Sequence, residues 1–330
     1  MTDRRGFRGE EDLEERAPQP YAYVPLPRGQ PPKALPVKGD GHRLESRGLL
    51  AGQLQGIIVA LTPVHVASGK LEMTEEIDPQ RAEEIPLVKG FVRSGGRRVI
   101  PASSLKGTIR SIAEAITFSC VGVAALGTFM PIQFRECRFD PAHGHAELCT
   151  ACRMFGAPGY MGQVRFSDAV QVEGGSQVML IPILHIPQRQ RRGRRFYFHG
   201  RPASGDVPVE VCPAGSRFRF DLQFENLRVG ELGVLLIALG QGEPQITPKL
   251  GGGKPACLGS VRMEVESLTL RGSRRQYLDY DAPEGGKSAE MAKYIAVAQR
   301  AKNLLFREGL QRLGEVLHYD EERECPSGGY

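Results

Sequence analysis

The sequence has no run of about 18 apolar residues, and its first residues lack the apolar stretch that a secretory signal requires. These residues are charged instead, as at Asp3, Arg4 and Glu10. The two absences argue against a membrane-spanning or secreted class of protein. We therefore expect a soluble, cytoplasmic chain with no membrane partner.

The chain also has few cysteines and a small net charge. Seven cysteines among 330 residues are too few for a disulfide scaffold. The formal net charge of +5 is a mild basic excess and is weak evidence for a nucleic-acid partner, so the places where basic residues gather are more informative. Hydrophobic residues make up 41% of the chain, which is enough to bury a substantial core.

Apolar periodicity predicts a short series of elements. An apolar, β-branched segment at 54–64 is typical of a buried strand, and residues 105–116 carry apolar side chains at helical spacing. Alternation and one further apolar run predict the other elements, which are strands at 163–168, 177–186, 217–224 and 260–270 and a helix at 231–239. The order β, α, β strands, α, β predicts an α+β fold with a ferredoxin-like core, which is also the frame of RNA recognition modules.

The remaining segments are predicted to lie outside this core. The polar, proline-rich arm is of a kind that is more often disordered, but Tyr21, Tyr23 and Val24 offer apolar anchors that a partner subunit could order. Residues 65–98 are interpreted as a long loop or hairpin. The predicted organisation is an extended arm at 1–50, a main domain at 51–271 with an insertion around 135–155 and inserted hairpin loops, and a linker with a C-terminal amphipathic helix at 272–330.

The first chemical motif is IPASSLKG at residues 100–107, where small hydroxyl residues and a lysine meet the start of the predicted helix. A helix N-terminus offers unpaired N–H groups and partial positive charge, and Lys106 adds a full charge, so a phosphate would be stabilised there. Taken alone, Ser103 and Ser104 more often indicate an ordinary helix cap beside an exposed lysine.

The second motif is LGGGKPACLGS at residues 250–260, a glycine-rich loop directly before a strand. Glycines let backbone amides approach a phosphate chain closely, and Lys254 supplies charge. It is not a P-loop, because Pro255 follows the lysine and a strand follows in place of a helix, so ATP hydrolysis is unsupported. In isolation a flexible hairpin turn explains the same residues.

A third glycine-rich segment, MFGAPGYMGQVRFSD at residues 154–168, again leads into a strand. Three such segments in one chain are seldom a coincidence. Together, IPASSLKG, MFGAPGYMGQVRFSDA and LGGGKPACLGSV resemble the signature segments of RAMP-superfamily CRISPR proteins, in the same order. The resemblance runs from about residue 21 to residue 270 and includes FYFHG at 196–200 and FENLRVGELGVLLIAL at 224–239.

This resemblance implies a guide-RNA-binding backbone subunit of a prokaryotic, antiviral CRISPR ribonucleoprotein effector. The partners it implies are CRISPR guide RNA, target RNA held as a duplex with the guide, copies of the chain itself, and other effector subunits, among them a separate nuclease as in type VII systems. The residues it places near the RNA backbone are Ser103, Ser104, Lys106, Gly251, Gly252 and Gly253. We predict that Arg110 and Lys254 also bind RNA.

A cluster of metal-ligating residue types lies at 137–152. Cys149 and Cys152 have the two-residue spacing that suits one tetrahedral ion, and Cys137 is distant enough to close the site from a second loop. We predict structural Zn²⁺ held by Cys137, His145, Cys149 and Cys152, with His143 as the open alternative for the fourth ligand. Without a metal, the same residues would be buried thiols beside surface histidines. Within the family, the cluster resembles the zinc-containing backbone proteins of type III-D, type III-E and type VII systems.

A basic run precedes two aromatic residues at 196–197. Arginines neutralise phosphates and neighbouring aromatic rings stack on bases, so this run is a second candidate RNA contact. A solvated basic loop is an equally good interpretation. The arginines concerned are Arg189, Arg191, Arg192, Arg194 and Arg195.

Catalysis is an open question at this level. RNA-cutting family members carry an aspartate between the first strand and the serine–lysine motif, and Glu84 occupies the best-matching position here, with Asp78 as a looser match. We expect a solvated acidic loop and hence a scaffold. The alternative is a target-RNA endoribonuclease using an acidic residue within 75–90, and a remoter one is guide processing with His185 or His199 as general base.

Overall fold

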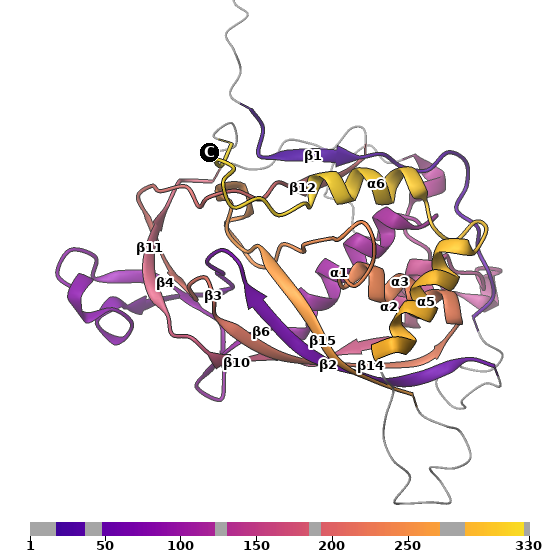
Figure 1. The fold of residues 1–330 in the computed structure, drawn as a ribbon, viewed down its shortest axis with the longest axis horizontal. Coiled ribbons are helices and arrows are strands. Elements are labelled where there is room, and N and C mark those ends of the chain that lie inside the picture. Colours follow the sequence, from indigo (N-terminus) through magenta and orange to yellow (C-terminus); the bar gives the residue numbers. More distant parts are fainter. Residues whose placement is uncertain (1–17, 37–47, 123–130, 185–192, 271–287, 327–330) are drawn as a thin grey trace, which may run out of the picture.

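The computed structural model describes residues 18–36, 48–122, 131–184, 193–270 and 288–326. These residues form a mixed α+β fold, as the sequence predicts, in which helices gather on one side of a large sheet (Figure 1). None of the helices in the described ranges combines the length and the apolar character needed to cross a membrane.

The main sheet has the strand order β15-β2-β14-β10-β6-β5, and every neighbouring pair is antiparallel. A further strand, β9, also pairs with β14. The bounds are β2 Leu50–Ala60, β5 Arg93–Ser94, β6 Arg97–Ile100, β9 Val164–Phe166, β10 Ala169–Glu173, β14 Arg217–Leu227 and β15 Val261–Leu270. The predicted strands at 54–64, 217–224 and 260–270 therefore exist and are adjacent in this sheet.

Alternation along β14 shows why these strands form. Phe218, Phe220, Leu222 and Phe224 are buried, and the residues between them are not. Because side chains on a strand point alternately to opposite faces, one face of the sheet is apolar and must be covered.

Helices supply that cover. α1 (Ala102–Ile116) buries Leu105, Ile109, Ile112 and Ile116, the face predicted from helical spacing. α3 (Val229–Ala238) is almost wholly buried because it packs against both α1 and α5. The other helices are α2 Thr150–Phe155, α5 Ser288–Arg300 and α6 Arg307–Val316. The single predicted C-terminal helix is therefore wrong in one respect, since a break separates α5 from α6.

A second sheet, with the order β11-β13-β4-β3, lies at the other end of the molecule (Figure 1). The hairpin of β3 and β4 projects from it, which resolves residues 65–98 in favour of a hairpin and not a loop. Leu71, Met73 and Leu87 are exposed on this hairpin. The bounds are β3 Ala67–Met73, β4 Leu87–Phe91, β11 Gln177–Ile181 and β13 Val207–Val211, with short 3-10 turns at Thr74–Glu76 and Pro79–Arg81.

The predicted N-terminal anchors contact the chain itself. β1 (Tyr21–Val24) pairs antiparallel with β12 (Arg194–Tyr197), and Val24 is fully buried. A partner subunit is therefore not needed to order these anchors, because β12 already supplies their backbone partners. A final short pair joins β7 (Gly156–Ala157) to β8 (Tyr160–Met161).

Candidate functional site

A cavity of about 430 Å³, here called the α1 cavity, lies between the first turns of α1, the glycine-rich loop and β12. It brings together two of the three glycine-rich or serine-rich motifs, which are separated by some 140 residues in the sequence. Its polar and aromatic lining consists of Ser103, Ser104, Thr108, Ser111, Arg195, Phe196, Tyr197, Lys249, Gly251, Gly252 and Lys254.

The start of α1 differs from the prediction of a serine cap. The helix begins at Ala102 and its N-cap is Pro101, which makes no side-chain cap. The carboxylate of Asp168 accepts a hydrogen bond from the Ala102 N–H at 2.8 Å. Ser103 and Ser104 consequently lie inside the first turn, with their side chains at the cavity. They are placed to meet a ligand and are not used as the cap.

The glycine-rich loop is held close to the segment that carries His65. The Gly252 N–H donates to the His65 carbonyl at 2.8 Å, and a Cβ on Gly251 would lie 2.1 Å from the same oxygen. Gly251 and Gly253 also have φ angles of +76° and +68°, which favour glycine. Any larger residue at 251 would therefore displace the loop. Just beyond it, Cys257 forms a disulfide with Cys325, which ties the C-terminal residues to the loop.

Lys249, Lys254 and Arg195 give the α1 cavity its positive charge. Lys249 is 5% exposed, and burial together with the nearby charge of Lys254 lowers its pKa to about 7. Burial also lowers the pKa of Lys254. The described lining residues include no acidic side chain, and the Nζ of Lys249 donates only to the Lys254 carbonyl, at 3.5 Å. An anion bound in the cavity would stabilise both ammonium groups and restore their pKa values.

Sequence reasoning missed Lys249 and misplaced Lys106. Lys249 stands before the glycine motif and carries no motif signal; only its position beside the loop could have suggested it. Lys106 does not line the cavity, because it lies on another face of α1, where burial and the charges of Arg110 and Arg165 lower its pKa. Arg195 does reach the cavity, with its guanidinium carbon 4.9 Å from the centre of the Tyr21 ring.

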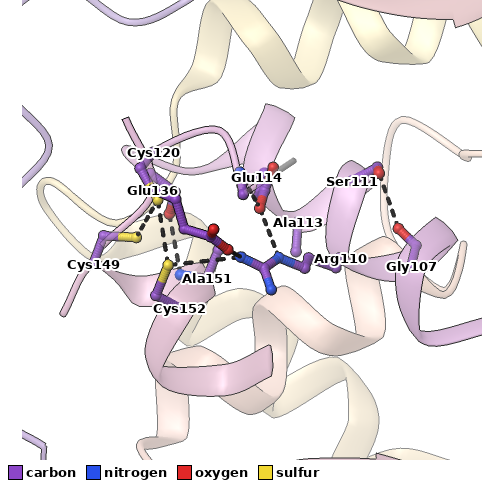
Figure 2. Close-up of polar contacts among 12 residues, drawn as sticks. Gly107, Arg110, Ser111, Ala113, Glu114, Cys120, Glu136, Cys149, Ala151 and Cys152 are labelled. Atoms are coloured by element: carbon purple, nitrogen blue, oxygen red, sulfur yellow. Dashed lines mark hydrogen bonds and ion pairs between the residues drawn. The ribbon is translucent and has the colours of Figure 1, made fainter. Parts of the chain in front are cut away.

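A second site is the cysteine cluster, formed by four buried thiols whose sulfur atoms all lie within 4.8 Å of one another. Cys120 comes from the segment after α1, Cys137 from a loop, and Cys149 and Cys152 from the start of α2. The Sγ of Cys120 lies 3.3 Å from that of Cys152 and 3.5 Å from that of Cys149 (Figure 2). The residues are Cys120, Cys137, Cys149 and Cys152.

This arrangement fits a tetrahedral metal ion. Zinc–sulfur bonds of about 2.3 Å place sulfur atoms roughly 3.8 Å apart, close to the separations seen here. The thiolate form of Cys149 is already favoured, because hydrogen bonds from the neighbouring thiols, first from Cys120, hold its pKa well below its ordinary value. Hydrogen bonds with the other three thiols, first with Cys120, raise the pKa of Cys152, and burial and the nearby Cys149 charge add to that rise. The Cys149 N–H also points to Cys137 Sγ at 3.5 Å.

The fourth member of the cluster corrects the sequence prediction. His145 is exposed and belongs to a tight turn in which its N–H donates to the Asp140 carbonyl at 3.0 Å. His143 is also exposed, and its Nδ1 lies 2.9 Å from an Asp140 carboxylate oxygen. Cys120 takes the place predicted for a histidine. It has no local spacing relation to the other three, so only the long-range packing of α1 against α2 brings it there.

Two arginines expected at RNA lie at the cysteine cluster instead. Arg110 donates to the Glu114 carboxylate at 2.8 Å and lies 3.8 Å from Cys152 Sγ (Figure 2). Arg194 is buried; it donates to Glu114 at 2.5 Å and to the Cys120 carbonyl at 2.7 Å. Glu114 therefore joins both guanidinium groups to the segment that carries Cys120, and these charges are satisfied within the chain.

The third glycine-rich segment also lies near the cysteine cluster. The Phe139 N–H donates to the Pro158 carbonyl at 2.8 Å, and a Cβ on Gly159 would lie 2.2 Å from the Phe139 carbonyl oxygen. The loop thus packs on the insertion that carries Cys137 and does not line the α1 cavity.

The other candidates fall elsewhere. Arg189, Arg191, Arg192 and His185 lie outside the described residues. His199 is fully buried, with its ring nitrogens 2.8 Å from Ser260 Oγ and 3.1 Å from the Thr247 carbonyl oxygen. Burial and the charge of Lys249 lower its pKa to about 3, so it is a poor general base at neutral pH, and its burial favours a packing role over the remoter alternative of guide processing.

The acidic candidates lie on the β3–β4 hairpin. Asp78 is the residue before the turn Pro79–Arg81, and Glu84 is exposed. Neither residue lines the α1 cavity or belongs to the cysteine cluster. Among the described residues, the cysteine cluster is the group of ligands that is close enough together to hold a metal ion.

A family model described as the RAMP superfamily matches residues 57–262, which is more than half of the chain. The matched range includes α1, the glycine-rich loop and the cysteine cluster. No curated protein matches the chain.

Proposed function

Because the chain belongs to the RAMP superfamily, we propose that it is the guide-RNA-binding backbone subunit of a CRISPR effector, and that copies of it assemble along the guide and hold the target RNA duplex. The observation that carries this proposal is the α1 cavity. There, the first turn of α1 and the glycine-rich loop surround Lys249 and Lys254, whose charges have no acidic partner in the lining.

The core is proposed to be ferredoxin-like. In support, β2, β10, β14 and β15 take the sheet order β15-β2-β14-β10 with antiparallel neighbours, α1 follows β2, and α3 follows β14. This is the β-α-β-β-α-β arrangement with the last strand beside the first. In such a core, α1 and the loop before β15 are near one another, which accounts for the position of the cavity.

The cavity would hold RNA through its phosphates. The hydroxyl groups of Ser103 and Ser104 can donate to phosphate oxygens, and the glycine-rich loop, which has no side chains at Gly251 and Gly252, lets a phosphate approach its backbone closely. Lys249 and Lys254 would neutralise the phosphate charge, and Phe196 and Tyr197 offer rings for base stacking. Because phosphates are the same at every nucleotide, such contacts suit a guide of any sequence.

The cysteine cluster is proposed to hold structural Zn²⁺ through Cys120, Cys137, Cys149 and Cys152. Bound zinc would supply a rigid cross-link among three chain segments. The Arg110 guanidinium, 3.8 Å from Cys152 Sγ, would offset the negative charge of a four-thiolate site. On the same ground we place the chain near the zinc-containing backbone proteins of type III-D, type III-E and type VII systems, with target cutting left to another subunit.

Co-expression with a CRISPR array tests the proposal. The full chain is purified under mild conditions and its bound nucleic acid is extracted and sequenced. We expect discrete guide-length RNA on a multimer, and we expect the Lys249→Met, Lys254→Met variant to lose that RNA while keeping its fold by circular dichroism. A variant that retains guide RNA at the level of the unmodified chain would refute the role of the cavity.

A further inference from the structure

A second cavity of about 320 Å³, here called the α3 cavity, has no role in the function proposed above. It shares no lining residue with the α1 cavity. Four segments meet at it, namely the N-terminal residues 32–34, the start of α2, the start of α3, and the connection between α5 and α6 at 301–304. It is therefore a meeting point of distant parts of the chain and not a gap within one loop.

The lining of the α3 cavity is strongly basic. It contains four basic side chains, Lys33, Arg153, Arg228 and Lys302, against one acidic side chain, Glu231. One oxygen of Glu231 pairs with Arg153, and the other accepts the Arg228 N–H at 2.9 Å. Both oxygens of the acid are thus already in use. No ion pair is found for Lys33, Arg228 or Lys302 within the described ranges.

Arg153, whose terminal nitrogen pairs with Glu231, also has one buried donor without a partner among the described residues. Its side chain is 7% exposed, and its buried Nε has no hydrogen-bond partner in the described part of the chain. A buried donor without an acceptor carries a desolvation cost, so such groups usually meet a partner. Gly230, in the first turn of the ten-residue helix α3, also lines the cavity and brings the positive end of the helix to it.

We propose that the α3 cavity binds a phosphate group, independently of the guide RNA in the α1 cavity. A phosphate offers several oxygens, which suits a guanidinium fork, a helix N-terminus and flexible surface cations converging from different sides. A carboxylate would leave most of these donors unused. The source of the phosphate is either a free nucleotide or the 5′-phosphorylated end of an RNA, since the recognising chemistry is the same for both.

Arginine Nε–Hε nuclear magnetic resonance on the full chain reads the unused donor directly. Inorganic phosphate is titrated into the protein, and the Arg153 signal is identified by its absence in Arg153→Lys. We expect that signal to move in a saturable way. The exposed pair Arg228→Gln, Lys302→Gln should weaken binding by roughly tenfold or more, because two charge-assisted contacts are lost.

The matched control is Lys293→Gln, Arg300→Gln, which removes the same charge from exposed positions on α5 outside the lining. It should leave the titration unchanged. An Arg153 signal that does not respond to phosphate, or an equal loss in both double variants, would overturn the proposal. Should Arg153→Lys not fold, the comparison of the two double variants by calorimetry gives the same decision.

Adenosine monophosphate and a short RNA with and without a 5′-phosphate then separate the two sources. Tighter binding of the mononucleotide than of the phosphorylated RNA assigns the site to a free nucleotide, and the reverse order assigns it to an RNA end. Binding that does not depend on the 5′-phosphate would contradict the site. Guide RNA retention in the Arg228→Gln, Lys302→Gln variant should remain normal, so failure here and failure of the α1 cavity are distinguishable.

Discussion

The cysteine cluster and the α1 cavity lie at two different faces of α1. Charged side chains are paired with one another at the first site and have no acidic partner in the lining of the second. On one face, Arg110 and Glu114 form a closed network with Arg194 beside the thiols. On the other, Lys249 is buried and Lys254 is half-buried at the cavity, without an acidic side chain in the lining. A region whose charges are paired within the chain stabilises the fold, whereas a region that leaves buried charge unpaired is suited to a ligand.

The largest effect should follow from removing two thiols of the cysteine cluster. Cys149→Ser, Cys152→Ser should abolish zinc binding and lower the free energy of unfolding by roughly 5 kcal/mol or more, since metal binding to such a site is coupled to folding. Metal analysis and urea unfolding measure both quantities. Cys212→Ser is the control, because Cys212 is a buried free thiol outside the cluster and its loss should leave zinc content unchanged. Full stability of the metal-free double variant would contradict a structural site.

The next effect concerns the network that supports the cluster. Glu114→Gln removes the charge that faces both Arg110 and Arg194, and we expect a loss of about 3 kcal/mol because a buried guanidinium is left without its counter-ion. Glu225→Gln is the matched control, since Glu225 pairs with Arg165 at a more exposed position where such pairs contribute about 1 kcal/mol at most. Equal losses would show that Glu114 is no more important than a surface carboxylate.

At the α1 cavity, removal of a lysine charge should weaken RNA binding and leave the stability of the fold unchanged. Lys249→Met should weaken RNA binding roughly tenfold and reduce the salt dependence by about one phosphate contact. Fluorescence anisotropy over a salt series, with two guides of unrelated sequence, measures this. Lys293→Met, on the exposed surface of α5, should have little effect. A loss confined to one guide sequence would argue against contact with the phosphate backbone.

The titration of Lys249 should make RNA affinity at the α1 cavity depend on pH. Its pKa is about 7 in the free protein, with Lys254 and the neutral His199 as neighbours, and a bound phosphate would raise it. Above pH 7 the complex then holds more protons than the free protein, so affinity should fall as pH rises, by at most about tenfold per pH unit. Lys249→Arg should flatten the profile. Identical profiles for the two proteins would exclude Lys249 as the titrating group.

The smallest effect is expected at the hairpin, which belongs to neither region. Glu84→Ala and Asp78→Ala should leave target RNA intact or cut to the same extent as in the unmodified complex. Denaturing gels of labelled target RNA, incubated with guide-loaded complex, measure this. Regularly spaced cuts that disappear in either variant would replace the scaffold interpretation with an endoribonuclease.

The sequence predicted the features that depend on the spacing of residues close together in the chain. The buried face of α1 follows from helical spacing, β14 follows from alternation, and the pairing of Cys149 with Cys152 follows from one turn of helix. Residues 65–98 were harder, because β3 is largely exposed and β4 has only five residues, so neither shows the sustained apolar alternation that marks a strand.

The sequence could not show which residues, distant along the chain, come into contact in the fold. Cys120 joins the cluster only because α1 packs on α2, and Lys249 reaches the α1 cavity only because the glycine-rich loop folds back under His65. The same limit misdirected Arg110 and Arg194, whose type suits RNA but whose buried carboxylate partner, Glu114, is visible only in the fold.

Ultraviolet crosslinking of guide RNA to the full chain, followed by mass spectrometry of the peptides, tests the central claim most directly. The account predicts crosslinks in β12, at Phe196 and Tyr197, and in the glycine-rich loop around Lys254, all of which line the α1 cavity. Crosslinks confined to other surfaces, with both of these segments unmodified, would contradict the assignment of the α1 cavity as the site that holds the guide.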